Sequence, residues 1–212
     1  MIDISSYLPG ILAAYAILVV AASSPGPAVA LLIGIATEQG RTAALIATLG
    51  ISTGSMTINI LTMLGVGVVI SQAAWAVSIL RVVGALYLLY LAYGAFTKAI
   101  RPPNLEKVEL IHRKKSKHFF VGYLLQVTNP KAISFWIAIA SIGAVDGATL
   151  PIVIAFFIGA FFISFVCHGT WALALSLEGV RRGYFAIRRW VEATLGCLFT
   201  FFAFNLATAE SS

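Results

Sequence analysis

Long apolar stretches separated by short polar segments account for most of this 212-residue chain. Six of these stretches are long enough to cross the hydrocarbon core of a bilayer as a helix, which takes about 20 residues. The six predicted helices cover residues 7–24, 43–70, 73–97, 119–141, 149–177 and 190–208. Because they use up almost the whole chain, the pattern predicts an all-α membrane protein with a single integral domain over residues 1–212.

The composition favours a membrane protein over a soluble one. Hydrophobic residues make up 60% of the chain and charged residues only 10%, far from the balance of a soluble domain. Most of the cations behind the net charge of +6 lie in two polar linkers, at 98–118 and 177–189. Since cationic loops stay on the cytoplasmic side of a membrane, these charges indicate contact with a lipid bilayer and not with nucleic acid.

The positions of the two basic linkers predict the topology. Placing both linkers in the cytoplasm puts both chain termini outside. Three predicted helices precede the first linker, whose basic cytoplasmic part is about 100–117, and three follow it. The first repeat, about 1–99, therefore enters the membrane from the opposite side to the second, about 118–212. We expect six transmembrane helices arranged as two inverted three-helix repeats.

Each half begins with a helix that carries proline in an unfavourable place. The first has Pro-Gly-Pro at 25–27, within "ASSPGPAVAL", and the second has Asn-Pro-Lys at 129–131, within "VTNPKAISFW". Proline removes a helical hydrogen bond and disfavours helical geometry at the residue before it, and lipid offers no other partner. We therefore expect the first helix of each half to be broken at proline. Paired breaks indicate the binding site of a transporter, with a packing kink at each proline as the alternative.

The groups expected at the two breaks suit a ligand that carries both charges. Half-helices beginning at Pro27 and Pro130 would point their N-termini toward the break, and Lys131 would add a full positive charge, so a carboxylate is favoured. Carbonyl groups near Ser24 and the amide of Asn129 can accept hydrogen bonds from an ammonium group. A zwitterion suits the site. The alternative for Lys131 is that it snorkels or bonds to a backbone carbonyl as a structural residue.

The second predicted helix carries polar side chains on one face and glycines on the other. The polar positions recur every three or four residues and stay within an arc of roughly 80°. They are Thr48, Ser52, Ser55, Asn59 and Thr62. Gly50 and Gly54 lie on the opposite face, with the spacing that lets membrane helices pack closely. The polar face can line a transport path, or its hydroxyl groups can bond to carbonyls of their own helix.

Three segments of the chain together resemble a known family. They are "SSPGPAVALLIGIATEQGRTAALIATLGISTG", "VGALYLLYLAYGAF" and "NPKAISFW", and in order and spacing they resemble signature segments of the LysE/RhtB family of bacterial amino-acid exporters. The resemblance covers nearly the full chain. It implies a six-helix secondary transporter of the bacterial cytoplasmic (inner) membrane, which exports amino acids or close derivatives and is driven by the proton gradient.

The resemblance leaves the proton-coupling residue open. Many members of the family carry an acidic residue where this chain has Ser55, so a simple carboxylate relay is not expected here. The candidates for proton coupling are Glu38, His168 or the substrate itself. The candidate substrate-binding residues are Ser24, Pro25, Gly26, Pro27, Ser55, Asn59, Asn129, Pro130 and Lys131.

Two other classes of six-helix membrane protein remain as alternatives. A thiol or electron carrier would use paired cysteines, but Cys167 and Cys197 fall in the fifth and sixth predicted helices, away from both breaks. A metal-ion transporter would need a cluster of carboxylate, His or Cys ligands, which the sequence does not offer. The sequence contains no enzyme motif and predicts no cofactor or metal site. The expected partners are a small amino-acid-like substrate and the bilayer, with a homodimer left open.

Overall fold

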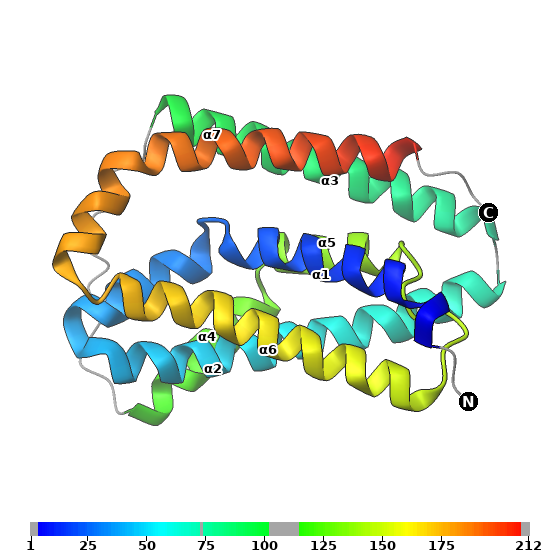
Figure 1. The fold of residues 1–212 in the computed structure, drawn as a ribbon, viewed down its shortest axis with the longest axis horizontal. Helices are drawn as coiled ribbons and strands as arrows, with labels where there is room; N and C mark the ends of the chain where they lie inside the picture. Colours follow the sequence, from blue (N-terminus) through cyan, green and yellow to red (C-terminus); the bar gives the residue numbers. More distant parts are fainter. Residues whose placement is uncertain (1–3, 73, 102–114, 209–212) are drawn as a thin grey trace.

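A computed structural model describes residues 4–72, 74–101 and 115–208, and the regular elements in these ranges are all helices (Figure 1). They are a short 3-10 helix η1 (Ile4–Ser6), then α1 (Leu8–Ser23), α2 (Pro27–Gln72), α3 (Ala74–Ile100), α4 (Lys115–Val127), α5 (Pro130–Ala140), α6 (Leu150–Ala174) and α7 (Glu178–Thr208). The prediction of an all-α protein is confirmed. Most of the predicted basic linker lies outside the described residues.

Both predicted helix breaks are present in the structure. Ser24 is extended, with φ −77° and ψ 134°, and the next helix, α2, begins at Pro27. Asn129 is also extended, with φ −76° and ψ 111°, and α5 begins at Pro130. Proline is well suited to the first helical position because the N–H that it lacks would have no partner inside the helix, while the residue before it is held away from helical geometry. The same rule thus produces both breaks.

Helix α2 bends sharply at Gly40. The backbone there has φ 81° and ψ 174°, so two helical segments follow each other within α2. Only glycine adopts this conformation without strain. The segment before Gly40 is the half-helix predicted to begin at Pro27, and the segment after it contains the second predicted helix, 43–70. The bend was not predicted from the sequence.

The ends of the helices gather at two opposite ends of the molecule (Figure 1). One end holds the start of α1, the end of α2, the start of α6 and the end of α7. The other end holds the bend in α2, the end of α3, the start of α4 and the turn between α6 and α7. This grouping is compatible with a topology in which the basic segments lie together on one side of a membrane.

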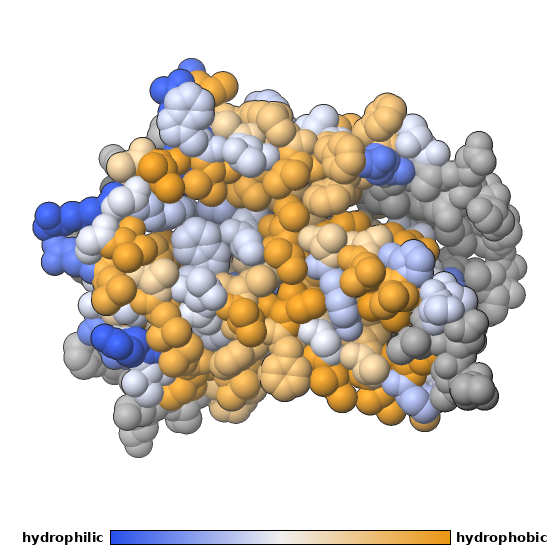
Figure 2. All heavy atoms as spheres, in the orientation of Figure 1, coloured by the Kyte–Doolittle hydropathy of each residue, from blue (hydrophilic) through white to orange (hydrophobic). Residues whose placement is uncertain are grey.

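The outside of the molecule is apolar along its middle. Figure 2 shows hydrophobic side chains over the central part of the visible face and hydrophilic ones mainly toward the ends. The large exposed apolar side chains include Leu61, Leu86, Tyr93, Phe162 and Phe204. Among the described helices, Pro27–Gly65 within α2 and all of α6 are long and apolar enough to cross a membrane. Such an exterior suits a lipid surface far better than water.

Helices α2 and α4 pack with their backbones in direct contact. A Cβ atom added at Gly50 would lie 2.0 Å from the carbonyl oxygen of Phe119, and one at Gly122 would lie 2.2 Å from that of Ala47. Any side chain at either glycine would therefore force the helices apart. The close packing predicted for the glycine face of the second helix is confirmed, and α4 is its partner.

Candidate functional site

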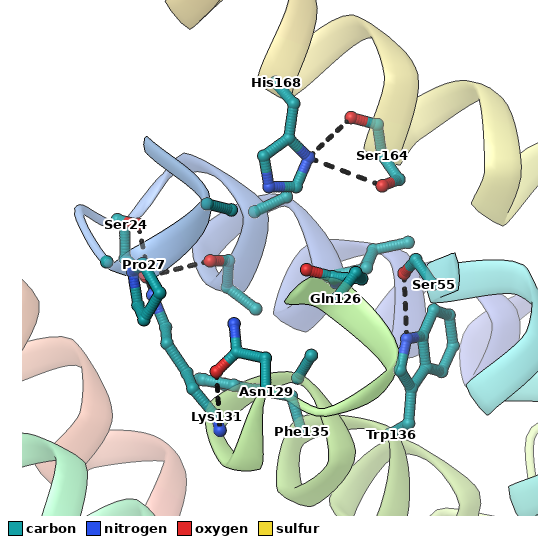
Figure 3. Close-up of a pocket in the computed structure, with 16 residues that line it drawn as sticks. Ser24, Pro27, Ser55, Gln126, Asn129, Lys131, Phe135, Trp136, Ser164 and His168 are labelled. Atoms are coloured by element: carbon teal, nitrogen blue, oxygen red, sulfur yellow. Dashed lines mark hydrogen bonds between the residues drawn. The ribbon is translucent and has the colours of Figure 1, made fainter. Parts of the chain in front are cut away.

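The two helix breaks meet at a cavity inside the bundle (Figure 3). Its walls come from α1, α2, α4, α5 and α6, and its apolar side includes Phe135 and Trp136. The polar residues that line it are Ser24, Ser55, Gln126, Asn129, Lys131, Ser164 and His168. The space open to the centres of water molecules is about 40 Å³, enough for roughly three waters. The cavity is therefore small in this conformation.

Lys131 joins the two breaks directly. Its Nζ donates a hydrogen bond of 3.1 Å to the carbonyl oxygen of Ser24 and a second, short one to the Ser24 hydroxyl oxygen. A Cβ atom at Gly26 would lie 3.2 Å from the same Nζ, so glycine at this position leaves room for the lysine head group. The bond to a backbone carbonyl is the structural contact considered for Lys131 from the sequence, yet the side chain also lines the cavity.

Asn129 caps the half-helix that begins at Pro130. Its Oδ1 accepts a hydrogen bond of 3.1 Å from the backbone N–H of Lys131, which satisfies one of the unpaired donors at a helix N-terminus. The oxygen predicted to accept from an ammonium group is thus already used for capping. The amide nitrogen points into the cavity (Figure 3). Asn129 therefore presents a donor to the cavity, which suits a carboxylate.

His168 presents a basic nitrogen to the cavity. Its Nδ1 lies 2.9 Å from the carbonyl oxygen of Ser164, and a carbonyl can only accept, so Nδ1 carries the hydrogen. The Nε2 atom is then left with a free lone pair, and the ring edge that carries it faces the cavity (Figure 3). His168 is buried, with 5% of its surface exposed. It can accept a proton or a hydrogen bond from a ligand.

Four of the five residues of the predicted polar stripe on α2 are buried, Thr62 is partly buried, and one member reaches this cavity. Ser55 lines the cavity and accepts a hydrogen bond of 3.0 Å from Nε1 of Trp136. Thr48 bonds to a carbonyl of its own helix. Ser52 and Asn59 are 0% exposed, and within the described part of the chain the Ser52 hydroxyl and both amide atoms of Asn59 have no hydrogen-bond partner. Unpartnered polar groups this deep are rare in folded proteins.

The structure brings most of the predicted site residues together. Besides the polar lining, Gly26 and Pro27 border the cavity, and Pro130 begins the helix below it. Pro25 lines a second cavity on the other side of the same break. Asn59 lies outside the lining, and Glu38 is exposed near the bend in α2 and borders neither cavity.

Sequence reasoning did not identify two features of this region. Gln126 lies one helical turn before Asn129 and lines the cavity. The sequence feature that could have identified it is a single amide side chain in an apolar stretch just before the break. Glu192, near the start of the predicted helix 190–208, is only 2% exposed. Its burial comes from packing between helices far apart in sequence, which a single sequence does not reveal.

Comparison with known proteins gives consistent matches over most of the chain. The family model described as LysE type translocator matches residues 19–210. The chain is 30% identical over 198 residues to a threonine efflux protein of Escherichia coli (strain K12), covering 89% of this chain and 92% of that protein. It is 29% identical over 192 residues to a threonine efflux protein of Salmonella typhi, with the same two shares covered. No solved structure matches the chain.

Proposed function

Because the chain belongs to the LysE type translocator family, we propose that it exports an amino acid or a close derivative across the bacterial inner membrane as a secondary transporter. The observation that carries this proposal is the cavity at the two breaks, where Lys131 contacts Ser24 and two helix N-termini lie close by. The names of the two relatives support a small neutral amino acid such as threonine as the substrate.

Binding would proceed by an exchange of partners at the breaks. The substrate carboxylate takes the place of Ser24 as the acceptor for Lys131 and also receives hydrogen bonds from the Asn129 amide and from N–H groups behind Pro27. The carbonyl and hydroxyl oxygens of Ser24 are then released. They accept hydrogen bonds from the substrate ammonium, so the exchange leaves no charged group of the site unpaired.

The transport cycle follows from inverted repeats of about 1–99 and 118–212. In this scheme the half-helix at Pro27 corresponds to α5, and both place their N-termini at the site. Rocking of one repeat against the other would open the small cavity to either side of the membrane in turn. The unpartnered Ser52 and Asn59 support a path along α2, because they would gain partners when that path is hydrated.

Proton coupling is assigned to His168 rather than to Glu38. The lone pair of His168 faces the cavity, while Glu38 is exposed near the bend in α2. A proton taken up from outside would make His168 a cation beside the substrate ammonium and favour its release there. Loss of that proton to the cytoplasm would restore a neutral acceptor, so protons would move inward as the amino acid moves outward.

The comparisons do not favour the two alternative functions. Cys167 and Cys197 are free thiols, and neither lines the cavity at the breaks, as a thiol carrier acting there would require. No group of three metal-ligating side chains occurs within the described residues. Export also fits the proposed topology, with the basic segments in the cytoplasm and both chain termini outside.

Efflux from loaded cells tests the proposed function. Cells that express the chain are loaded with radiolabelled L-threonine and, in parallel, with each of the other protein amino acids. We expect faster efflux of at least one of them than from cells with an empty vector, and slower efflux after collapse of the proton gradient. If no amino acid leaves faster in cells that contain the inserted protein, amino-acid export is wrong.

A further inference from the structure

The exchange of partners at the two breaks leaves the amide of Gln126 unused. This residue lies in the last turn of α4, and its side chain reaches into the cavity at the breaks (Figure 3). Gln126 is 5% exposed, and its Oε1 has no hydrogen-bond partner among the described residues. An amide oxygen buried this deeply normally has a donor. Gln126 therefore offers an acceptor that a ligand in the cavity can use.

Gln126 is held in place from two sides. Its carbonyl oxygen accepts a hydrogen bond of 3.1 Å from the backbone N–H of Asn129, which ties the residue to the second break. A Cβ atom added at Gly54 would lie 3.0 Å from Cβ and 3.4 Å from Cγ of Gln126, so the stem of the glutamine packs directly against the backbone of α2. This packing limits the directions open to the side chain and preorganises its amide for a ligand.

Other oxygen acceptors of the cavity already serve donors of the protein. The hydroxyl oxygen of Ser55 accepts a hydrogen bond of 3.0 Å from Nε1 of Trp136. The carbonyl and hydroxyl oxygens of Ser24 accept from Nζ of Lys131, and in the proposed exchange they pass to the substrate ammonium. The oxygen of Gln126 is thus available to a third polar group of the substrate.

The third polar group of an amino acid belongs to its side chain. In the proposed function Lys131 binds the carboxylate and Ser24 the ammonium group, so the side chain is the part left to meet Gln126. The space open to water centres is about 40 Å³, which favours a short side chain. A hydroxyl group supplies the donor that Oε1 lacks, whereas an alkyl group of the same shape would leave this oxygen buried and unpaired.

We propose that Gln126 determines the substrate specificity of the site, with its Oε1 accepting a hydrogen bond from the side-chain hydroxyl of a short hydroxy amino acid such as threonine or serine. The proposal rests on the proposed function of amino-acid export and narrows its class of substrate. A site built to bond a substrate hydroxyl discriminates strongly against the analogue without it, because a buried polar group of the protein then stays unpaired.

Two pairs of amino acids of equal shape test this assignment. L-Valine carries a methyl group where L-threonine carries its hydroxyl, and L-2-aminobutyrate is related to L-serine in the same way. The full-length protein in lipid nanodiscs is dialysed to equilibrium against each of the four radiolabelled compounds. We expect the wild type to bind threonine and serine about ten- to hundredfold more tightly than their alkyl counterparts.

The variant Gln126→Met removes the acceptor and nearly keeps the length and volume of the side chain. The affinity for threonine and serine should fall and that for valine and 2-aminobutyrate should not, so each ratio should drop to about twofold or less. Gln39→Met is the matched control. Gln39 also has a buried amide atom without a partner among the described residues, but it lines neither cavity. The control should keep the wild-type ratios.

Wild-type protein that binds both members of each pair equally would overturn the assignment, and this result does not depend on the folding of any variant. Unchanged ratios in Gln126→Met would place the hydroxyl at another acceptor, such as Nε2 of His168. An equal loss for all four compounds would place the ammonium group at Gln126. Either result also overturns the proposal.

The same measurements separate this proposal from the proposed function. Export of other amino acids by a protein that binds none of the four compounds would overturn the hydroxyl specificity and leave amino-acid export standing. Failure of every protein amino acid both to bind and to leave loaded cells faster would overturn both proposals.

Discussion

The two proline breaks have the same backbone form and opposite chemistry. At the first, Ser24 offers a carbonyl and a hydroxyl oxygen, and Gly26 offers only space. At the second, Lys131 offers a cation and Asn129 an amide donor. Ser24 at the first break therefore supplies acceptors, and the side chains of Lys131 and Asn129 at the second supply donors. Two breaks of similar backbone shape can thus form one site that distinguishes the carboxylate from the ammonium group of a zwitterion.

Among the substitutions that leave all charges in place, Pro130→Ala should cause the largest loss of efflux. Alanine restores an N–H that can extend α4 through Asn129, which draws the half-helix end away from the cavity. We expect efflux to fall about tenfold or more at normal membrane levels. Pro151→Ala is the matched control, because Pro151 also begins a helix but lies exposed and far from the cavity. Equal efflux by both variants would show that the second break is a packing kink and not part of the binding site.

Gly26→Ala should weaken substrate binding by displacing the Lys131 head group, and this effect should be smaller than that of Pro130→Ala. The new Cβ would lie 3.2 Å from Nζ of Lys131, so the head group must shift by a few tenths of an ångström. A misplacement of about 1 Å can cost about a hundredfold, so we expect an affinity loss of about three- to tenfold. Gly94→Ala, where a Cβ meets nothing within 4 Å, serves as control in the same binding assay. Unchanged affinity in Gly26→Ala would show that Lys131 does not need its present position.

Asn129→Ala and Ser24→Ala should differ in stability. Removing the Asn129 cap from α5 should lower the free energy of unfolding by about 1 kcal/mol, measured as a lower midpoint of thermal unfolding in detergent. Ser24→Ala should change it less, because the hydroxyl group is lost but the carbonyl that bonds to Lys131 remains. If Ser24→Ala loses more unfolding free energy than Asn129→Ala, the Ser24 hydroxyl contributes more to stability than the Asn129 cap, contrary to this expectation.

Cysteine reactivity should show the smallest differences, between two positions on different faces of α2. In a background with Cys167 and Cys197 replaced by serine, Ser55→Cys should react with a small aqueous thiol reagent because it borders the cavity. Ala47→Cys should be protected, since Ala47 packs against α4. Equal protection at both positions would show that the polar face of α2 serves packing only.

The breaks could be predicted because proline acts locally. The geometry at Ser24 and Asn129 follows from the residues next to them, whatever the rest of the chain does. The close packing of Gly50 was also readable, because the absence of a side chain is itself the signal. The bend at Gly40 was not predicted, because glycine adopts positive and negative φ about equally readily and its neighbours in the sequence do not decide between them.

Contacts between distant helices could not be predicted in the same way. Glu192 is the third residue of the predicted helix 190–208, and none of its neighbours in the sequence indicates that it is buried. Its burial depends on how α7 packs against α2 and α3. The Asn129 oxygen was predicted to accept a hydrogen bond from a ligand, but it already accepts one from the backbone N–H of Lys131 as the cap of α5. Local rules thus located the site, while tertiary packing decided which atoms remain available in it.

Binding of a substrate and its ester to one variant tests the division of roles between the two breaks most directly. In Lys131→Gln, the affinity for L-threonine, or for whichever amino acid the wild type exports best, should fall by about 1.5–3 kcal/mol, roughly ten- to hundredfold. The methyl ester has no carboxylate, so its affinity should stay within about twofold of the wild-type value. Lys117→Gln, which removes an exposed cation of α4, should affect neither ligand. An equal loss for acid and ester in Lys131→Gln would contradict the assignment of the carboxylate to the second break.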